Sequence, residues 1–204
     1  MKQTIDYQAV QIADGNQVYF GADQHWFENK WHSVSGCGPT TAAQITMYMA
    51  KVFPETCAPL YPYALPAQKS EFITHMNTVR PYVKPGPMGL NSTQKFANGT
   101  AAYAKERGVT IVPLIVYRSL NMINAFGFIQ KAVEENYMPA LMILKNPNKE
   151  LSDFHWHWMA VTGCDSQTKS VFVATYGKEF ELPFEQVWHQ QHPYETGIVY
   201  FYPD

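Results

Sequence analysis

The order of apolar and polar positions divides the chain into helix-like and strand-like segments. Apolar residues recur at helical spacing, bounded by proline, glycine or capping residues, over residues 39–52, 69–78, 91–107 and 121–136. Runs rich in β-branched, apolar or aromatic residues predict strands at 109–117, 139–145, 157–164, 170–177, 178–183 and 197–204. Helices therefore gather in the first two thirds of the chain, and strands in the last third.

The remaining segments carry turn signals. Residues 7–20 form two partly alternating runs around Asp14, Gly15 and Asn16, which predicts a hairpin. Residues 23–35 are polar and aromatic without a period and are expected to form a loop. Prolines interrupt residues 54–90, where the short helix is flanked by turns.

The separation of helices from strands predicts an α+β fold with an antiparallel sheet. The chain has 204 residues and no linker-like stretch, so we expect a single domain over 1–204. Hydrophobic residues make up 46% of the chain and charged residues 16%, as expected for a globular protein with a substantial core.

Charge and hydropathy exclude some partners. Fifteen basic and seventeen acidic residues give a net charge of -2, and no run of Lys or Arg is long enough to follow a nucleic-acid backbone. No stretch approaches the roughly eighteen apolar residues of a membrane span, and the N-terminus has no apolar core of signal-peptide length. We expect no nucleic acid, no membrane segment and a cytoplasmic location, unless an export segment has been removed.

The chain has three cysteines, an odd number without CxxC spacing: Cys37, Cys57 and Cys164. This spacing predicts neither a disulfide framework nor a cysteine zinc site, and at least one thiol must be free.

Cys37 lies at the predicted start of a helix, in the segment SGCGPTTAAQITMYMA. Gly36 and Gly38 allow unusual backbone dihedral angles and close approach of a substrate, and Pro39 suits a first helical turn. Unsatisfied amides at a helix N-terminus stabilise a thiolate and lower the thiol pKa. Taken alone, the segment fits a nucleophile and a small buried hydrophobic residue equally well.

The block Gly-Cys-Gly-Pro-Thr, followed by small residues and a helix, resembles the nucleophile helix of the papain-like cysteine peptidases. The similarity is to the branch of bacteriocin-processing (C39-like) peptidases. The resemblance implies two further residues: an upstream side-chain amide that holds the oxyanion, and a downstream histidine on a strand.

Both implied residues have candidates. Gln24 lies upstream in an aromatic segment similar to that of these families and is the candidate oxyanion donor, with Asn29 as a weaker one. Downstream, the segment HWMAVTG resembles the family's histidine strand, which makes His157 the candidate base. His155, two residues earlier on the same strand, would point to the same face, as a supporting residue or as half of a metal-binding pair.

This sequence departs from the family pattern at the residue that orients the histidine. Aligning Gly177 with the glycine of the family's Asn-Ser-Trp-Gly or Asp-Pro-Trp-Gly block leaves Ala174 at the orienting position. The alanine side chain cannot accept a hydrogen bond. Thr175 is the nearest hydroxyl, although it would point to the opposite face from Ala174. A backbone carbonyl, Asp153 or Glu179 are the alternatives.

The resemblance implies a papain-like fold with the nucleophile helix packed on an antiparallel sheet. It implies peptide hydrolysis by Cys37 and His157 on a peptide or protein substrate, with no cofactor and no metal. Acyl transfer of the transglutaminase type on the same fold, a degenerate peptide-binding domain, and a metal-binding fold remain alternatives. Trp26, Trp31, Trp156 and Trp158 are candidates either for the cleft wall or for the core.

Overall fold

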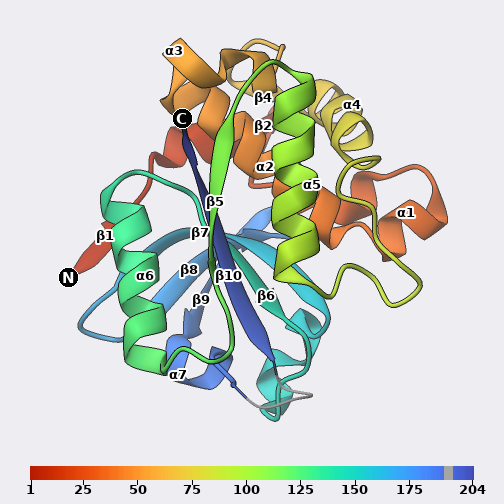
Figure 1. The fold of residues 1–204 in the computed structure, drawn as a ribbon. Helices are drawn as coiled ribbons and strands as arrows, with labels where there is room; N and C mark the ends of the chain where they lie inside the picture. Colours follow the sequence, from red (N-terminus) through yellow and green to blue (C-terminus); the bar gives the residue numbers. More distant parts are fainter. Residues whose placement is uncertain (191–194) are drawn as a thin grey trace.

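An antiparallel sheet organises the protein, whose computed structural model describes residues 1–190 and 195–204 (Figure 1). The strand order is β5-β10-β6-β7-β8-β9, and β1 pairs with β7 beside this path. Each of these pairings is antiparallel. The strands are β1 (Lys2–Thr4), β5 (Ile111–Val116), β6 (Ala140–Ile143), β7 (His157–Asp165), β8 (Ser170–Thr175), β9 (Lys178–Pro183) and β10 (Thr196–Pro203).

Helices cover the sheet and form the N-terminal part of the protein. In Figure 1, α5 and α6 run along the face of the sheet near β5 and β10, and α2 lies deeper. The α-helices are α1 (Lys30–Val34), α2 (Cys37–Val52), α3 (Pro54–Cys57), α4 (Lys69–Val79), α5 (Thr93–Glu106), α6 (Met122–Glu134) and α7 (Phe184–Val187). Short 3₁₀ helices are η1 (Tyr7–Val10), η2 (Gln24–Trp26), η3 (Ala58–Leu60) and η4 (Lys149–Phe154).

Helix α2 is the central helix of the molecule. Every residue from Cys37 to Ala50 is buried, and the helix packs against β7, α4, α5 and η1. A helix enclosed on all sides has no polar face, so its buried polar residues need partners inside the protein. Those residues are Thr40, Thr41, Gln44 and Thr46.

A second, small sheet is formed by three short strands from the first third of the sequence. It contains β2 (Gln11–Asp14), β3 (Gln17–Phe20) and β4 (Ala67–Gln68), with β2 central. The β2–β3 hairpin confirms the turn predicted at Gly15, which has a φ of 60°. The first part of the predicted hairpin was wrong, because residues 7–10 form η1, which Asp6 caps by accepting from the Gln8 N–H.

The predicted α+β class is confirmed, with helices and an antiparallel sheet. The predicted loop over residues 23–35 instead contains η2 and α1. Both are too short to show a helical period, and each begins at a residue whose side chain accepts backbone N–H groups, Asp23 and Asn29. None of the helices formed by the described residues has the length and apolar character that crossing a membrane requires.

Gly21 joins β3 to the segment that carries Gln24, and it requires glycine for two reasons. Its φ is +78°, and a Cβ atom there would lie 2.7 Å from the Ala174 Cβ and 2.8 Å from the Gln44 Nε2. Because both neighbours are buried, the backbone has little room to yield.

We expect Gly21→Ala to lower the free energy of unfolding by about 2–4 kcal/mol, from the positive φ and the overlap together. Gly15→Ala is the matched control, since Gly15 also has a positive φ but has open space around it. Gly15→Ala should lower the free energy of unfolding by only about 1–2 kcal/mol. Urea denaturation measures both, and equal losses would show that the close approach at Gly21 does not matter.

Candidate active site

Cys37, the predicted nucleophile, lies where the first turn of α2 meets the start of β7. Its thiol donates a hydrogen bond to the backbone carbonyl of Trp156, with 3.7 Å between sulfur and oxygen. Only 7% of the residue is exposed. Gly36 precedes the helix, and no side chain caps it. The first amides of α2 therefore remain available to a negative charge at this position.

The glycines on either side of Cys37 are explained by close packing. Neither has a positive φ, so the unusual dihedral angles expected from the sequence are absent. A Cβ atom at Gly36 would lie 2.4 Å from the His32 carbonyl oxygen, and one at Gly38 would lie 2.7 Å from the Leu90 side chain. A side chain at Gly36 would therefore strike backbone, and one at Gly38 would have to displace the Leu90 side chain.

Burial dominates the electrostatics of the thiol. It raises the pKa of Cys37, while nearby backbone N–H groups of Trp158, Gly38 and Cys37 itself act in the opposite direction. The helix amides expected from the sequence are thus present, but the thiol pKa is raised overall, because water is excluded. In this closed arrangement Cys37 is a neutral thiol.

His157, the predicted base, is the first residue of β7 and is 4% exposed. Its Nε2 lies 2.7 Å from the Thr175 Oγ1, and its ring stacks on Tyr176 with 4.7 Å between centroids and 12° between planes. Burial, aided by the nearby charge of His25, lowers the pKa of His157 to about 3. The imidazole is therefore neutral at physiological pH.

The register of β7 and β8 explains why Thr175, and not Ala174, contacts His157. Ala160 pairs with Ala174, so the antiparallel ladder continues to Thr175 opposite Met159. Residues two apart on a strand share a face, which places Thr175 diagonally across from His157 on the same face. The Ala174 side chain instead lies against Gly21, where there is room only for a small side chain.

Gln24 lies in η2, across from the thiol. Its Nε2 donates to the Ser33 carbonyl at 2.9 Å, which leaves the second N–H of that amide group unused by this bond. Asn29, the weaker candidate, instead caps α1 by accepting from the N–H groups of Trp31 and His32. Asn29 is thereby occupied away from the thiol.

Four residues predicted from sequence line one small cavity, although they come from four separate elements. The cavity measures about 10 Å³, close to the volume needed for one water molecule. It is lined by Ala22, Gln24, Cys37, Thr40, Thr41, Gln44, His157, Trp158, Ala174 and Thr175. The arrangement combines a thiol, an imidazole held by a hydroxyl, and a side-chain amide.

The other residues considered from sequence lie elsewhere. His155 precedes the strand, and its Nε2 accepts the Asn146 N–H at 3.2 Å, so the predicted shared face with His157 was wrong. Glu179 accepts from Thr162 at 2.7 Å. Asp153 contributes its backbone carbonyl to the Tyr176 hydroxyl. Within residues 1–190 and 195–204, no three His, Cys, Asp or Glu gather as a metal site would require.

The four tryptophans considered from sequence divide between core and surface. Trp158 is 1% exposed, stacks on Phe96 at 4.2 Å and donates to the Leu90 carbonyl, so it belongs to the core. Trp26 is partly buried against the core. Trp156 and Trp31 are exposed by 38% and 56%, and the backbone carbonyl of Trp156 accepts the hydrogen bond from Cys37.

Sequence reasoning missed the strained backbone at the site. Trp156 and Tyr176 have φ values of 53° and 52°, which bulky residues rarely adopt. One directly precedes His157, and the other follows Thr175. Such strain persists only where surrounding packing enforces it, and it concentrates at functional sites. Gln44 was also missed, although an amide side chain two helical turns after Cys37, in a helix whose neighbouring residues are mostly apolar, was a visible signal.

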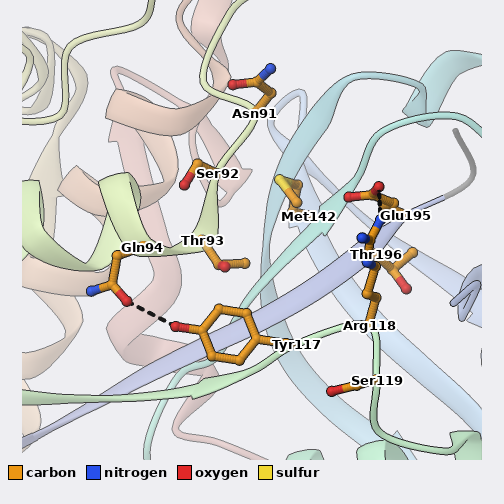
Figure 2. Close-up of a pocket in the computed structure, with 10 residues that line it drawn as sticks. All are labelled: Asn91, Ser92, Thr93, Gln94, Tyr117, Arg118, Ser119, Met142, Glu195 and Thr196. Carbon is orange, nitrogen blue, oxygen red and sulfur yellow. Dashed lines mark hydrogen bonds and ion pairs between the residues drawn. The ribbon is translucent and has the colours of Figure 1, made fainter. Parts of the chain in front are cut away.

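A larger pocket lies apart from this cavity, between the start of α5 and the strands β5, β6 and β10 (Figure 2). Its volume is about 380 Å³. Arg118 forms an ion pair with Glu195, and the Tyr117 hydroxyl donates to Gln94 at 2.8 Å. The two cavities share no lining residue.

Comparisons with known proteins add little to this geometry. No family model matches the chain, and no curated protein matches it. Among solved structures, the crystal structure of the Pseudomonas avirulence protein AvrPphB is similar with a TM-score of 0.39 and 10% sequence identity. The similarity covers 81% of this chain and 90% of that one. A likeness this distant carries no function across.

Two buried histidines should make the protein less stable in acid. Burial lowers the pKa of His75 to about 4 and that of His157 to about 3, whereas both titrate near 6.5 when unfolded. Below about pH 6.5 the unfolded chain therefore binds more protons. Stability should fall by roughly 2 kcal/mol per histidine between pH 8 and pH 5.

Urea denaturation at pH 8 and pH 5 measures this loss. His75→Gln removes one buried imidazole far from Cys37 and should remove about half of the acid sensitivity attributed to the pair. An identical pH dependence in the variant would mean that His75 titrates normally in the folded protein.

Proposed function

We propose that this protein is a papain-like cysteine peptidase in which Cys37 is the nucleophile and His157 is the general base. The observation that carries the proposal is the shared cavity of Cys37, His157, Thr175 and Gln24. Each residue type supplies a different requirement of acyl chemistry: a nucleophile, a base, an orienting group and an oxyanion donor.

Thr175 selects the form of His157 that can accept a proton from the thiol. If Nε2–H donates to the threonine hydroxyl, Nδ1 carries the free lone pair of the neutral imidazole. The lowered pKa of His157 keeps that lone pair available across the neutral range. The hydroxyl thus takes the role that the sequence pattern led us to seek at Ala174.

The reaction begins with a neutral thiol and a neutral imidazole. As the Cys37 sulfur attacks the carbonyl carbon, its proton passes to His157, and the new oxyanion is held by the Cys37 backbone N–H and the Gln24 amide. His157 then protonates the departing amine, which leaves an acyl group on the sulfur. Water, activated by His157, releases the acid and restores the thiol.

Hydrolysis and acyl transfer share this acyl intermediate and differ only in the acceptor. Added amines distinguish them, because a transferase forms an amide product where hydrolysis is negligible. Two observations motivated the degenerate-domain alternative: Ala174 at the orienting position and the absence of an export signal. The hydrogen bond between His157 and Thr175 weakens the first of them.

Alkylation of Cys37 tests the nucleophile and base directly. We expect iodoacetamide at neutral pH to label Cys37 selectively, because Cys37 is 7% exposed and shares its cavity with His157, whereas Cys57 and Cys164 are fully buried. His157→Ala should slow the labelling by roughly 100-fold or more, since no base remains to take the proton. Intact mass and peptide mapping measure rate and position.

Two further variants keep this experiment decisive. Cys37→Ala should abolish the label, and His157→Gln preserves a partner for Thr175 while removing the base, which separates loss of the base from loss of folding. Unchanged labelling of folded His157→Gln, or labelling that moves to Cys57 or Cys164, would contradict the proposal.

The hydroxyl of Thr175 should matter for the rate. Thr175→Val keeps the shape but leaves the buried Nε2 without its partner, so we expect Cys37 labelling to slow by about 10- to 100-fold. Thr175→Ser should retain most of the rate. Thr162→Val is the matched control, since it removes a buried strand hydroxyl bonded to Glu179 away from the cavity. Equal effects of the two valine variants would indicate a merely structural role.

A further inference from the structure

Three buried polar atoms without a protein partner belong to residues that line the cavity shared by Cys37 and His157. They are the Gln24 Oε1, the Thr40 Oγ1 and the Gln44 Nε2, and none has a hydrogen-bond partner among the described residues. Gln44 and Thr40 are 1% and 5% exposed. Leaving such a group unsatisfied costs roughly 1–3 kcal/mol, so their meeting in one cavity requires an explanation.

We propose that one buried water molecule bridges these three atoms, and that Gln44 and Thr40 are positioning residues which hold the Gln24 amide ready for the oxyanion. The inference rests on the proposed function, because it assigns these residues to the same site. Its structural part, the bridging water, is independent of that function.

The orientation of each amide is fixed by a bond on its other side. The Gln44 Oε1 accepts the Ala22 N–H at 3.2 Å, so its Nε2 is the end left for the cavity. The Gln24 Nε2 donates to the Ser33 carbonyl, so its Oε1 is the end left for the cavity. A donor and an acceptor therefore line the same space without bonding each other.

One water molecule satisfies this set of groups. It accepts from the Gln44 Nε2, donates to the Gln24 Oε1, and pairs with the Thr40 hydroxyl, which can donate or accept. Buried waters typically make about three such bonds. The cavity, at about 10 Å³, is at the lower limit of the space that one water requires.

The spacing along α2 links this water to the nucleophile. Thr40 and Gln44 follow Cys37 by three and seven residues, which places all three on one face of the helix. Gln44 also ties the Ala22 backbone, two residues before Gln24, to the same helix. The thiol and the amide that would stabilise the oxyanion are thus held by one connected set of bonds.

The consequence concerns which end of the Gln24 amide faces the reaction. With Oε1 held by the water, the second N–H of Nε2 is free for an oxyanion. If the amide turned over, a carbonyl oxygen would face the developing negative charge and repel it. The bridging water therefore reinforces the orientation that the bond to the Ser33 carbonyl already favours.

The test compares two reactions of Cys37, only one of which creates an oxyanion. Acylation by p-nitrophenyl acetate passes through a tetrahedral intermediate, whereas alkylation by iodoacetamide does not. We expect Gln44→Met and Thr40→Val to slow acylation about 10-fold, less than direct loss of an oxyanion donor, while alkylation changes less than about 2-fold. Thr40→Ser should restore acylation.

Thr46→Val is the matched control on α2, since the Thr46 hydroxyl is buried but bonds the Ala42 and Ala43 carbonyls and His75 outside the cavity. It should leave the ratio of the two rates unchanged. Equal slowing of both reactions in Gln44→Met, or an unchanged ratio, would overturn the positioning role.

A high-resolution crystal structure of the wild-type protein tests the water itself. Density for one water within about 3 Å of all three atoms supports the inference, and a dry cavity or a direct bond between the two amides overturns it. If wild-type Cys37 resists both reagents, the proposed function and the positioning role fail together, and the crystal structure alone decides the water.

Discussion

The contact between the first turn of α2 and the first residues of β7 is the constraint on which the candidate site depends. The Cys37 thiol donates a hydrogen bond to the backbone carbonyl of Trp156. His157, the first residue of β7, follows directly. Gly36 and Gly38 fix the position of this first turn, because a Cβ atom at Gly36 would strike the His32 carbonyl and one at Gly38 would strike Leu90. The small residues around the cysteine therefore hold the start of α2 against His32 and Leu90, in the place where the thiol shares a cavity with the His157 imidazole.

The same close packing sets the charge state of the site. Excluding water raises the pKa of the thiol and lowers that of the imidazole, so both groups are neutral at rest. The backbone N–H groups near the sulfur provide the opposing influence, which gains weight when negative charge develops. The surrounding packing also enforces the strained backbone of Trp156 and Tyr176, which adjoin His157 and Thr175.

How far the sequence predicts this arrangement depends on whether each feature is local. Cys37 and His157 are marked by short motifs, and the long helices follow from periodicity, as α2 and α6 illustrate. The contact of Thr175 with His157 depends on how β7 pairs with β8, and no local pattern specifies that pairing. The alignment with the family motif placed Ala174 at the orienting position instead. His155 was assigned to the strand because the left-handed backbone of Trp156 is invisible in a sequence that has no glycine at that position.

The central claim is that Cys37 cleaves peptide bonds, and the most direct measurement uses a diverse synthetic peptide library analysed by mass spectrometry. Wild-type protein is predicted to produce new peptide termini, and Cys37→Ala, prepared in the same way, is predicted to produce none. Equal cleavage by the two proteins, or no cleavage of any library peptide by the wild type, would contradict the assignment.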